Sequence, residues 1–176
     1  QFIETIVLLS INHQSLIATK ANRIVRAAQG RGIMEFGTRR AHGGTGAVHG
    51  ARAAYIGGCI GTACALAERD FKIPALGTMA HSWVQMFPNE YEAFKAYARI
   101  YPENCVLLVD TYNVIKSGIP AAIKVLQEMR PPMMGIRIDS GDVTYLTKRA
   151  RSMLDKAGLR ECKIVVSNSL DEYIIR

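Results

Sequence analysis

The chain has 176 residues, 49% of them hydrophobic and 21% charged, a composition typical of one globular domain with a real core. Its formal net charge is +7, which indicates a basic surface or a site for phosphorylated or carboxylate ligands. The lysines and arginines are scattered and not interleaved with aromatic residues, and no apolar run of about 18 residues occurs. We therefore expect no nucleic-acid partner and no membrane span.

Residues 3–29 are predicted to form a long helix, because apolar residues recur at helical spacing and two glycines follow at 30 and 32. The sequence opens inside this pattern without a secretory leader, so we expect a piece of a longer cytoplasmic protein. The four cysteines form no CxxC pair, which favours buried reduced thiols over a thiolate metal site.

From residue 31 onward the sequence alternates between short apolar runs and helical patterns. The runs lie at 33–36, 55–60, 73–77, 105–110, 133–138 and 163–168, and the helical patterns at about 45–55, 62–69, 80–98, 112–128, 142–157 and from about 170. Continuous apolar runs are typical of strands buried on both faces, as in parallel sheets. The alternation predicts an α/β fold, either an open doubly wound sheet or an incomplete (β/α) barrel of about six βα units over 31–176. We favour the barrel.

Polar residues follow each predicted strand, where parallel α/β folds place their sites. They are Arg39, Arg40, Thr62, Thr78, His81, Asp110, Thr111, Arg137, Asp139, Ser140, Asp142, Ser167 and Asn168. Some of them have simpler explanations, because serine and aspartate at strand ends often cap the next helix. Ser140, Asp142 and Ser167 are open to that interpretation, and a lone histidine is more often structural than catalytic.

Arg137 and Asp139 are the most informative pair. They lie two residues apart in a strand pattern, so both side chains point to the same face. In a barrel that face is the interior, where an arginine and an aspartate are costly unless they are paired or used. The Gly-rich run HGGTGAVHG (42–50) matches neither nucleotide-binding fingerprint, and a flexible loop is the favoured interpretation over a phosphate cradle.

These residue types suit a phosphorylated sugar. Arginines neutralise phosphate oxygens, and carboxylates hold ribose hydroxyls or a magnesium ion. His81 follows GTMA at the predicted start of a helix, where unpaired N–H groups would favour a phosphorylated side chain. No nucleophile elbow and no HExxH motif is present, which disfavours hydrolysis by those routes.

Taken together, EFGTRRAHG, GTMAHSWVQMF, LLVDTYNVIKSGIP, MGIRIDSGD and IVVSNSLDE resemble nicotinate phosphoribosyltransferase. The resemblance implies an irregular α/β barrel of the type II phosphoribosyltransferase kind with a separate smaller domain. It also implies formation of nicotinate mononucleotide from nicotinate and phosphoribosyl pyrophosphate, with coupled ATP hydrolysis, in NAD biosynthesis. Magnesium, a cytoplasmic location and a homodimer are further implications.

The resemblance also implies roles for particular residues. His81 would be the histidine phosphorylated by ATP, and Asp110, Arg137 and Asp139 would form the cluster around pyrophosphate, ribose and metal, with Asp110 and Asp139 as candidate metal ligands. The remaining candidates bind substrate: Phe36, Arg39, Arg40 and Thr78 near the pyridine, Ser167 and Asn168 near the phosphoribosyl group, and Thr111 and Ser140 as further substrate-binding residues.

One stretch departs from the family pattern. Where the family often has an aspartate before the second strand's GT, this sequence has Ile60, and Ala63 follows the GT. A ribose or metal contact at that strand is therefore in doubt. Two alternatives stay open: a nicotinamide phosphoribosyltransferase, against which the Arg39–Arg40 doublet argues, and a non-catalytic phosphate-binding fragment.

Overall fold

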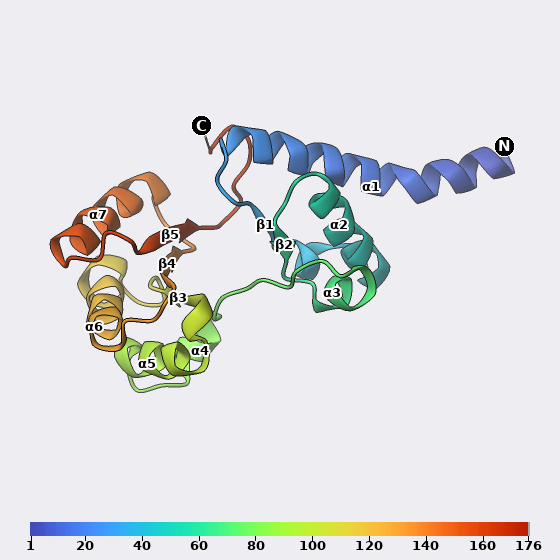
Figure 1. The fold of residues 1–176 in the computed structure, drawn as a ribbon. Coiled ribbons are helices and arrows are strands. Elements are labelled where there is room, and N and C mark those ends of the chain that lie inside the picture. The colour runs from blue at the N-terminus through green and yellow to red at the C-terminus, as the bar shows by residue number, and fades with distance from the viewer. Residues whose placement is uncertain (176) are drawn as a thin grey trace. The chain divides into compact units, whose positions relative to one another are not determined.

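The computed structural model describes residues 1–175, which form two compact units (Figure 1). The first unit comprises Gln1–Gly77 and the segment from Leu170 onward, and the second comprises Thr78–Ser169. Unit 1 contains helices α1 (Phe2–Ala27), α2 (Gly44–Ile56) and α3 (Ala65–Phe71), the 3-10 turn η1 (Thr38–Arg40) and strands β1 (Met34–Glu35) and β2 (Gly61–Thr62). Unit 2 contains helices α4 (His81–Gln85), α5 (Glu90–Ile100), α6 (Ile119–Met129) and α7 (Val143–Lys156), the 3-10 turn η2 (Pro102–Asn104), the π-helical turn η3 (Val114–Gly118) and strands β3 (Cys105–Leu108), β4 (Met134–Ile138) and β5 (Lys163–Val166).

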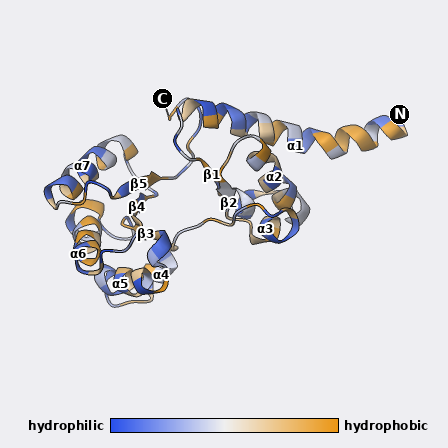
Figure 2. Ribbon diagram, viewed as in Figure 1, coloured by the Kyte–Doolittle hydropathy of each residue, from blue (hydrophilic) through white to orange (hydrophobic). Residues whose placement is uncertain are grey.

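Helix α1 confirms the long helix predicted at the start of the chain. Its second half packs on α2 through Ala21 and Ala54, and Lys20 forms an ion pair with Glu172 at 2.5 Å. Its first half exposes large apolar side chains on all sides, which appear as the orange turns in Figure 2. Among the described residues, neither α1 nor any other helix combines the length and the apolar character needed to cross a membrane.

The sheet of unit 1 is small. Strands β1 and β2 pair in parallel with Glu35 opposite Thr62, and a single bridge joins Thr62 to Ala75. The strand predicted over 55–60 is wrong, because α2 continues to Ile56 and a turn at Gly57 and Gly58 follows it. The favoured interpretation of residues 42–50 as a flexible loop is also wrong, since α2 begins at Gly44.

The sheet of unit 2 has the order β3-β4-β5, with all pairs parallel. Figure 1 shows α5, α6 and α7 along one side of this sheet. Ile136 and Ile138 of β4 are fully buried in the core that these helices form with the sheet. Since side chains alternate along a strand, Arg137 lies on the opposite face.

Three predicted helices differ from the structure. The pattern over 80–98 is interrupted between Gln85 and Glu90, where Pro88 precedes Asn89, and the Asn89 side chain caps α5 by accepting a hydrogen bond from Glu92 N. The pattern over 112–128 consists of η3 followed by α6. The segment from 170 to 175 forms turns, where the sequence predicted a helix.

An α/β fold with parallel sheets is therefore confirmed. Neither sheet closes on itself within residues 1–175, so no complete barrel is observed.

All four cysteines are free and buried, as the sequence predicted. Burial raises the pKa of the thiols of Cys59, Cys105 and Cys162 to about 11. These thiols therefore carry little thiolate at neutral pH.

Gly118 tests how closely η3 packs against the end of β3. A Cβ at this position would lie 1.9 Å from the backbone oxygen of Val109, so Gly118→Ala should lower the free energy of unfolding by at least about 2 kcal/mol, as overpacking does. The control is Gly44→Ala, because a Cβ at Gly44 meets no atom within 4 Å. Urea unfolding measures both variants, and a Gly118→Ala protein as stable as the control would contradict this packing.

Candidate functional site

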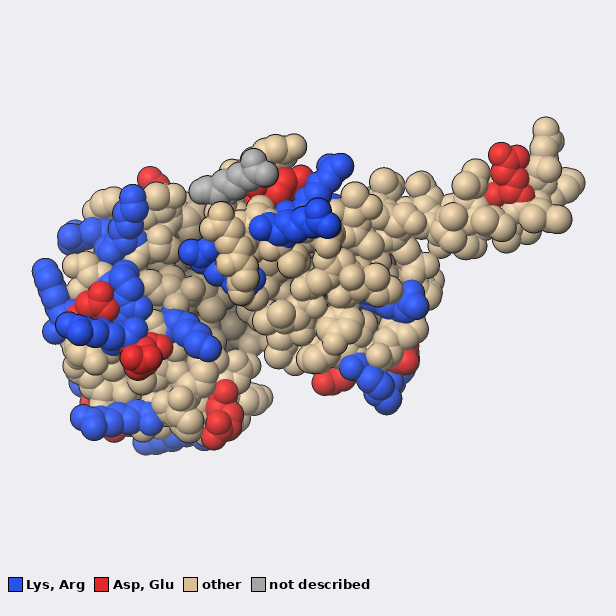
Figure 3. Space-filling model, turned by 45° about the horizontal axis from the view of Figure 1, so that its top comes forward, with Lys and Arg blue, Asp and Glu red and all other residues tan. Residues whose placement is uncertain are grey.

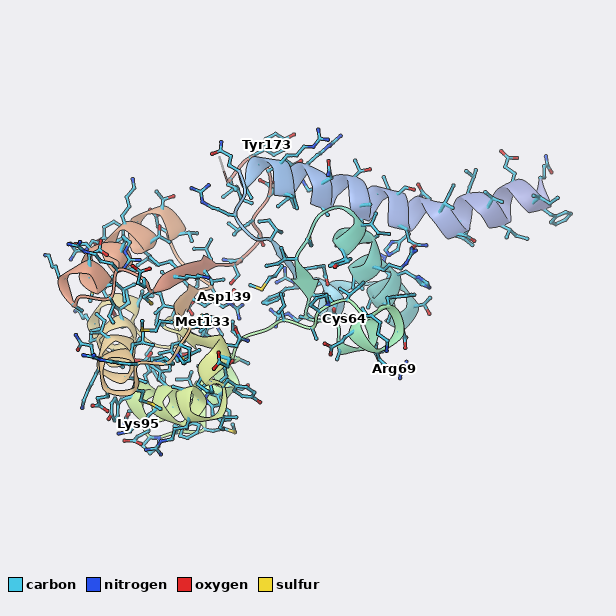
Figure 4. The ribbon with its side chains drawn as sticks, in the orientation of Figure 1. Cys64, Arg69, Lys95, Met133, Asp139 and Tyr173 are labelled. Carbon is cyan, nitrogen blue, oxygen red and sulfur yellow. The ribbon has the colours of Figure 1, made fainter. Side chains whose placement is uncertain are left out.

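Polar side chains gather at the carboxyl ends of the three strands of unit 2. Asp110 lies two residues beyond β3, Asp139 directly follows β4, and Ser167 directly follows β5. Parallel pairing brings these ends to one edge of the sheet, as the sequence predicted. Asp139 is labelled at this edge in Figure 4.

Arg137 is the centre of this cluster. Its Nε donates to Ser167 Oγ at 2.9 Å, its Nη1 to Thr78 Oγ1 at 2.8 Å and its Nη2 to Asp139 Oδ1 at 2.9 Å. The side chain is only 12% exposed, so its charge is largely removed from water and is offset by the carboxylate. The network holds the guanidinium in one orientation.

Asp139 also accepts a hydrogen bond from Ser167 Oγ. Burial acts to raise the pKa of the Asp139 carboxyl, but the hydrogen bond from Ser167 and the charge and hydrogen bond of Arg137 outweigh burial, with a further contribution from His81. The pKa therefore lies below its ordinary value, and Asp139 is an anion at neutral pH.

Asp110 is held from the neighbouring strand end. Its Oδ2 accepts hydrogen bonds from Asp139 N at 3.0 Å and from Ser140 Oγ at 2.6 Å. Its Oδ1 is buried and has no hydrogen-bond partner among the described residues. A buried carboxylate oxygen without a partner is costly, which indicates an atom that a ligand or a cation satisfies.

His81 faces both carboxylates. Its Nε2 lies 3.6 Å from Asp139 Oδ2 and 4.0 Å from Asp110 Oδ1, and its Nδ1 lies 3.2 Å from Thr111 Oγ1. The imidazole is 42% exposed, so one side meets the acidic pair and the other is open to solvent.

The structure separates network residues from helix caps. Ser140 and Ser167 contact Asp110 and Asp139, whereas the side chain of Asp142 caps α7 by accepting from Tyr145 N. Asn168 has a φ of 94° and makes no side-chain hydrogen bond to the other described residues of this network.

The predicted pyridine-binding residues Phe36, Arg39 and Arg40 lie in unit 1. They follow β1, and Arg39 and Arg40 belong to η1. Arg40 lines a cavity of about 280 Å³ together with Glu35, Thr38 and both His13 and His42. Phe36 and Arg39 are not part of that lining, and Thr78, expected near the pyridine, instead binds Arg137. Glu35 could not be singled out from the sequence, because it lies inside an apolar strand pattern.

Lysines and arginines are spread over the face of unit 2 shown in Figure 3, with acidic side chains among them. The clearest cationic feature of unit 2 near its sheet edge is the single buried guanidinium of Arg137. Its charge is paired with the carboxylate of Asp139, so the cluster carries both signs of charge.

The carboxylates of the cluster are candidate ligands for magnesium. Residues 1–175 contain no group of three or more His, Cys, Asp or Glu side chains arranged to hold a metal ion by themselves. Magnesium is usually bound by one or two carboxylates together with substrate phosphates and water. The unpaired Oδ1 of Asp110 and the Oδ2 of Asp139 fit that description.

The fold and the site define a class: α/β proteins with a cluster of charged side chains at the carboxyl edge of a parallel sheet. A model of the nicotinate phosphoribosyltransferase (NAPRTase) family matches residues 32–172. This chain therefore belongs to the nicotinate phosphoribosyltransferase family.

Individual relatives also point to the nicotinate phosphoribosyltransferase family. The chain is 50% identical to a nicotinate phosphoribosyltransferase of Bacillus subtilis over 99% of this chain and 36% of the relative. It is 46% identical to one of Mycobacterium tuberculosis over 98% of this chain and 37% of the relative. The chain thus spans little more than a third of the length of these curated relatives.

Two solved structures are similar. The human nicotinic acid phosphoribosyltransferase matches with a TM-score of 0.83 and 28% identity, over 98% of this chain and 46% of that chain. A nicotinate-nucleotide pyrophosphorylase from Pyrococcus furiosus matches with a TM-score of 0.81 and 29% identity, over 93% and 43%.

The lowered pKa of Asp139 makes stability depend on pH. A carboxyl whose folded pKa lies below its unfolded value, about 3.9, stabilises the fold above that value, and the stabilisation is lost as pH falls through the folded pKa. Asp139→Asn should therefore be less stable than wild type at pH 7, and the difference should shrink on acidification below about pH 4. Urea unfolding at pH 7, 5, 4 and 3 measures this. Asp142→Asn, which replaces one capping side chain by another, is the control, and a pH-independent gap for Asp139→Asn would contradict the prediction.

Proposed function

We propose that the complete protein transfers the phosphoribosyl group of phosphoribosyl pyrophosphate to nicotinate, with ATP hydrolysis coupled to the transfer, in cytoplasmic NAD biosynthesis. Family membership supports the reaction. The observation that carries it is the cluster of Arg137, Asp139, Asp110 and His81 at one edge of the sheet. Because the chain spans only part of its relatives, the proposal refers to the product of the complete gene.

His81 is the phosphate acceptor in this proposal. The two carboxylates face Nε2 and favour a proton on that nitrogen, as a carboxylate does for a catalytic histidine. Nδ1 then keeps its lone pair beside the hydroxyl of Thr111 and is the nitrogen that attacks the terminal phosphorus of ATP. The bond between that phosphorus and the bridging oxygen breaks, and ADP leaves with the electron pair.

The short length of α4 changes one part of the sequence argument. The helix that begins at His81 has five residues, so its dipole gives less support to a phosphorylated side chain than the predicted helix over 80–98 would. The side chains around His81 are the better explanation of its role.

The glycosyl transfer requires a bond at ribose C1 to break before a new one is complete. The C1–O bond to pyrophosphate breaks with its electron pair on oxygen, and the pyridine nitrogen of nicotinate forms the C1–N bond. Positive charge that develops at C1 is stabilised by Asp110 or Asp139, and Arg137 stabilises the leaving phosphate. Ser140, Ser167, Thr78 and Thr111 hold these groups in place, and Asn168 directly follows Ser167.

Asp110 and Asp139 would hold magnesium together with the substrate phosphates. The ion, when bound, would neutralise charge on the pyrophosphate. The pyridine is assigned to unit 1, where Phe36 supplies an aromatic ring and Arg39 and Arg40 favour a carboxylate over an amide, so nicotinate is preferred to nicotinamide as substrate. A homodimer and barrel closure by the rest of the protein complete the proposal.

Replacing His81 by Ala tests the coupling. His81→Ala should abolish phosphorylation by ATP and uncouple ATP hydrolysis from mononucleotide formation, while slow ATP-independent transfer remains. The assay compares ADP and nicotinate mononucleotide released per enzyme, with Ser82→Ala as a control next to His81. Coupled ATP hydrolysis in the His81→Ala protein would refute the assignment.

Arg137 tests the transfer step. Arg137→Ala should lower kcat by at least about a hundredfold, as loss of one preorganised donor does. The control is Arg69→Ala, because Arg69 is a surface residue of unit 1 paired with Asp70. Steady-state kinetics and a thermal unfolding curve are recorded for both, since Arg137 also neutralises Asp139. An effect under about fivefold would remove Arg137 from the reacting groups.

A further inference from the structure

Glu35 and Thr62 form a buried contact between the two strands of unit 1. The parallel register places them opposite one another, so their side chains point to the same face. Thr62 Oγ1 donates to Glu35 Oε2 at 2.5 Å and accepts from Cys64 N at 3.0 Å. Thr62 is fully buried, so this hydroxyl is shielded from competing water.

The other oxygen of Glu35 binds the turn that follows β1. Gly37 N donates to Glu35 Oε1, and Gly37 is the residue before η1. A Cβ at Gly37 would lie 2.8 Å from that oxygen, so a larger residue there would require the Glu35 side chain to shift. Both carboxylate oxygens are thus occupied by hydrogen bonds from within unit 1.

This arrangement links the ends of two strands through one carboxylate. Hydrogen bonds to a charged acceptor are shorter and stronger than neutral ones. They tie the start of η1 to the buried hydroxyl of Thr62, and η1 carries Arg39 and Arg40 while Phe36 lies between Glu35 and Gly37. Arg39 and Arg40 therefore lie on a turn whose first amide is fixed by Glu35, and Phe36 directly precedes that turn.

We propose that Glu35, held by Thr62, is a positioning residue for pyridine-carboxylate binding. It acts by fixing the turn at Gly37 to Arg40 and not by touching the substrate. The inference rests on the proposed function, because that function assigns nicotinate to this turn. It goes beyond that function by identifying a specificity-determining contact inside an apolar strand.

The test uses two substitutions of Thr62 in the product of the complete gene. Thr62→Val keeps the shape but removes the donor to Glu35, and Thr62→Ser keeps the donor. Thr62→Val should raise KM for nicotinate about tenfold and change kcat and KM for phosphoribosyl pyrophosphate less than about twofold, and Thr62→Ser should restore the nicotinate KM. Equal KM values for the two variants, or equal increases for both substrates, would overturn the inference.

A second measurement does not need turnover. Amide hydrogen exchange at Gly37 should be faster in Glu35→Ala and Thr62→Val than in wild type and Thr62→Ser, because Glu35 Oε1 accepts from that amide. Unchanged exchange in Glu35→Ala would overturn the role of Glu35. If wild type forms no nicotinate mononucleotide but exchange still responds, the proposed function fails and the structural link between Glu35 and the turn stands.

Discussion

The ion pair between Arg137 and Asp139 is the interaction on which the rest of unit 2 depends. Two residues of opposite charge, two positions apart on a strand, must share a face, and burial makes them costly unless they meet. Each then needs further partners, which come from the ends of the neighbouring strands and from Thr78, just before α4. Ser167 comes from the end of β5, and Asp110 comes from beyond the end of β3.

The register of the sheet therefore decides the composition of the site. A shift of β4 by one residue would move Arg137 and Asp139 to the face where Ile136 and Ile138 now pack. The apolar contacts of those isoleucines with the core hold the register, and the register holds the carboxylates near His81. Hydrophobic packing on one face and charge placement on the other are two results of the same alternation.

The sequence predicted best where a physical rule had one solution. The shared face of Arg137 and Asp139 followed from the period of a strand, and the gathering of polar residues followed from parallel topology. It predicted less well where small residues suit two conformations. The run YIGGCI is apolar enough for a strand, but Ile56 ends α2 and the glycines after it turn the chain. Glu35 could not be identified from the sequence because its structural role depends on a hydrogen bond from Thr62, which is 27 positions away.

At His81 the contribution of a helix dipole is smaller than the sequence predicted, for a related reason. Periodicity over 80–98 does not reveal that Pro88 and Asn89 start a new helix, and the length of α4 decides how much a helix end contributes. Tertiary contacts from Thr111, Asp110 and Asp139 replaced a local effect, and local sequence patterns carry no information about such contacts.

The buried thiols give the molecule an internal reporter of local opening. Cys59 and Cys64 lie in unit 1, and Cys105 and Cys162 lie in unit 2. A thiol reagent can react with them only when the surrounding packing opens, and the rates for the two pairs then report the opening of each unit separately. The reaction rates of the chain's own cysteines would show whether the two units open together or independently.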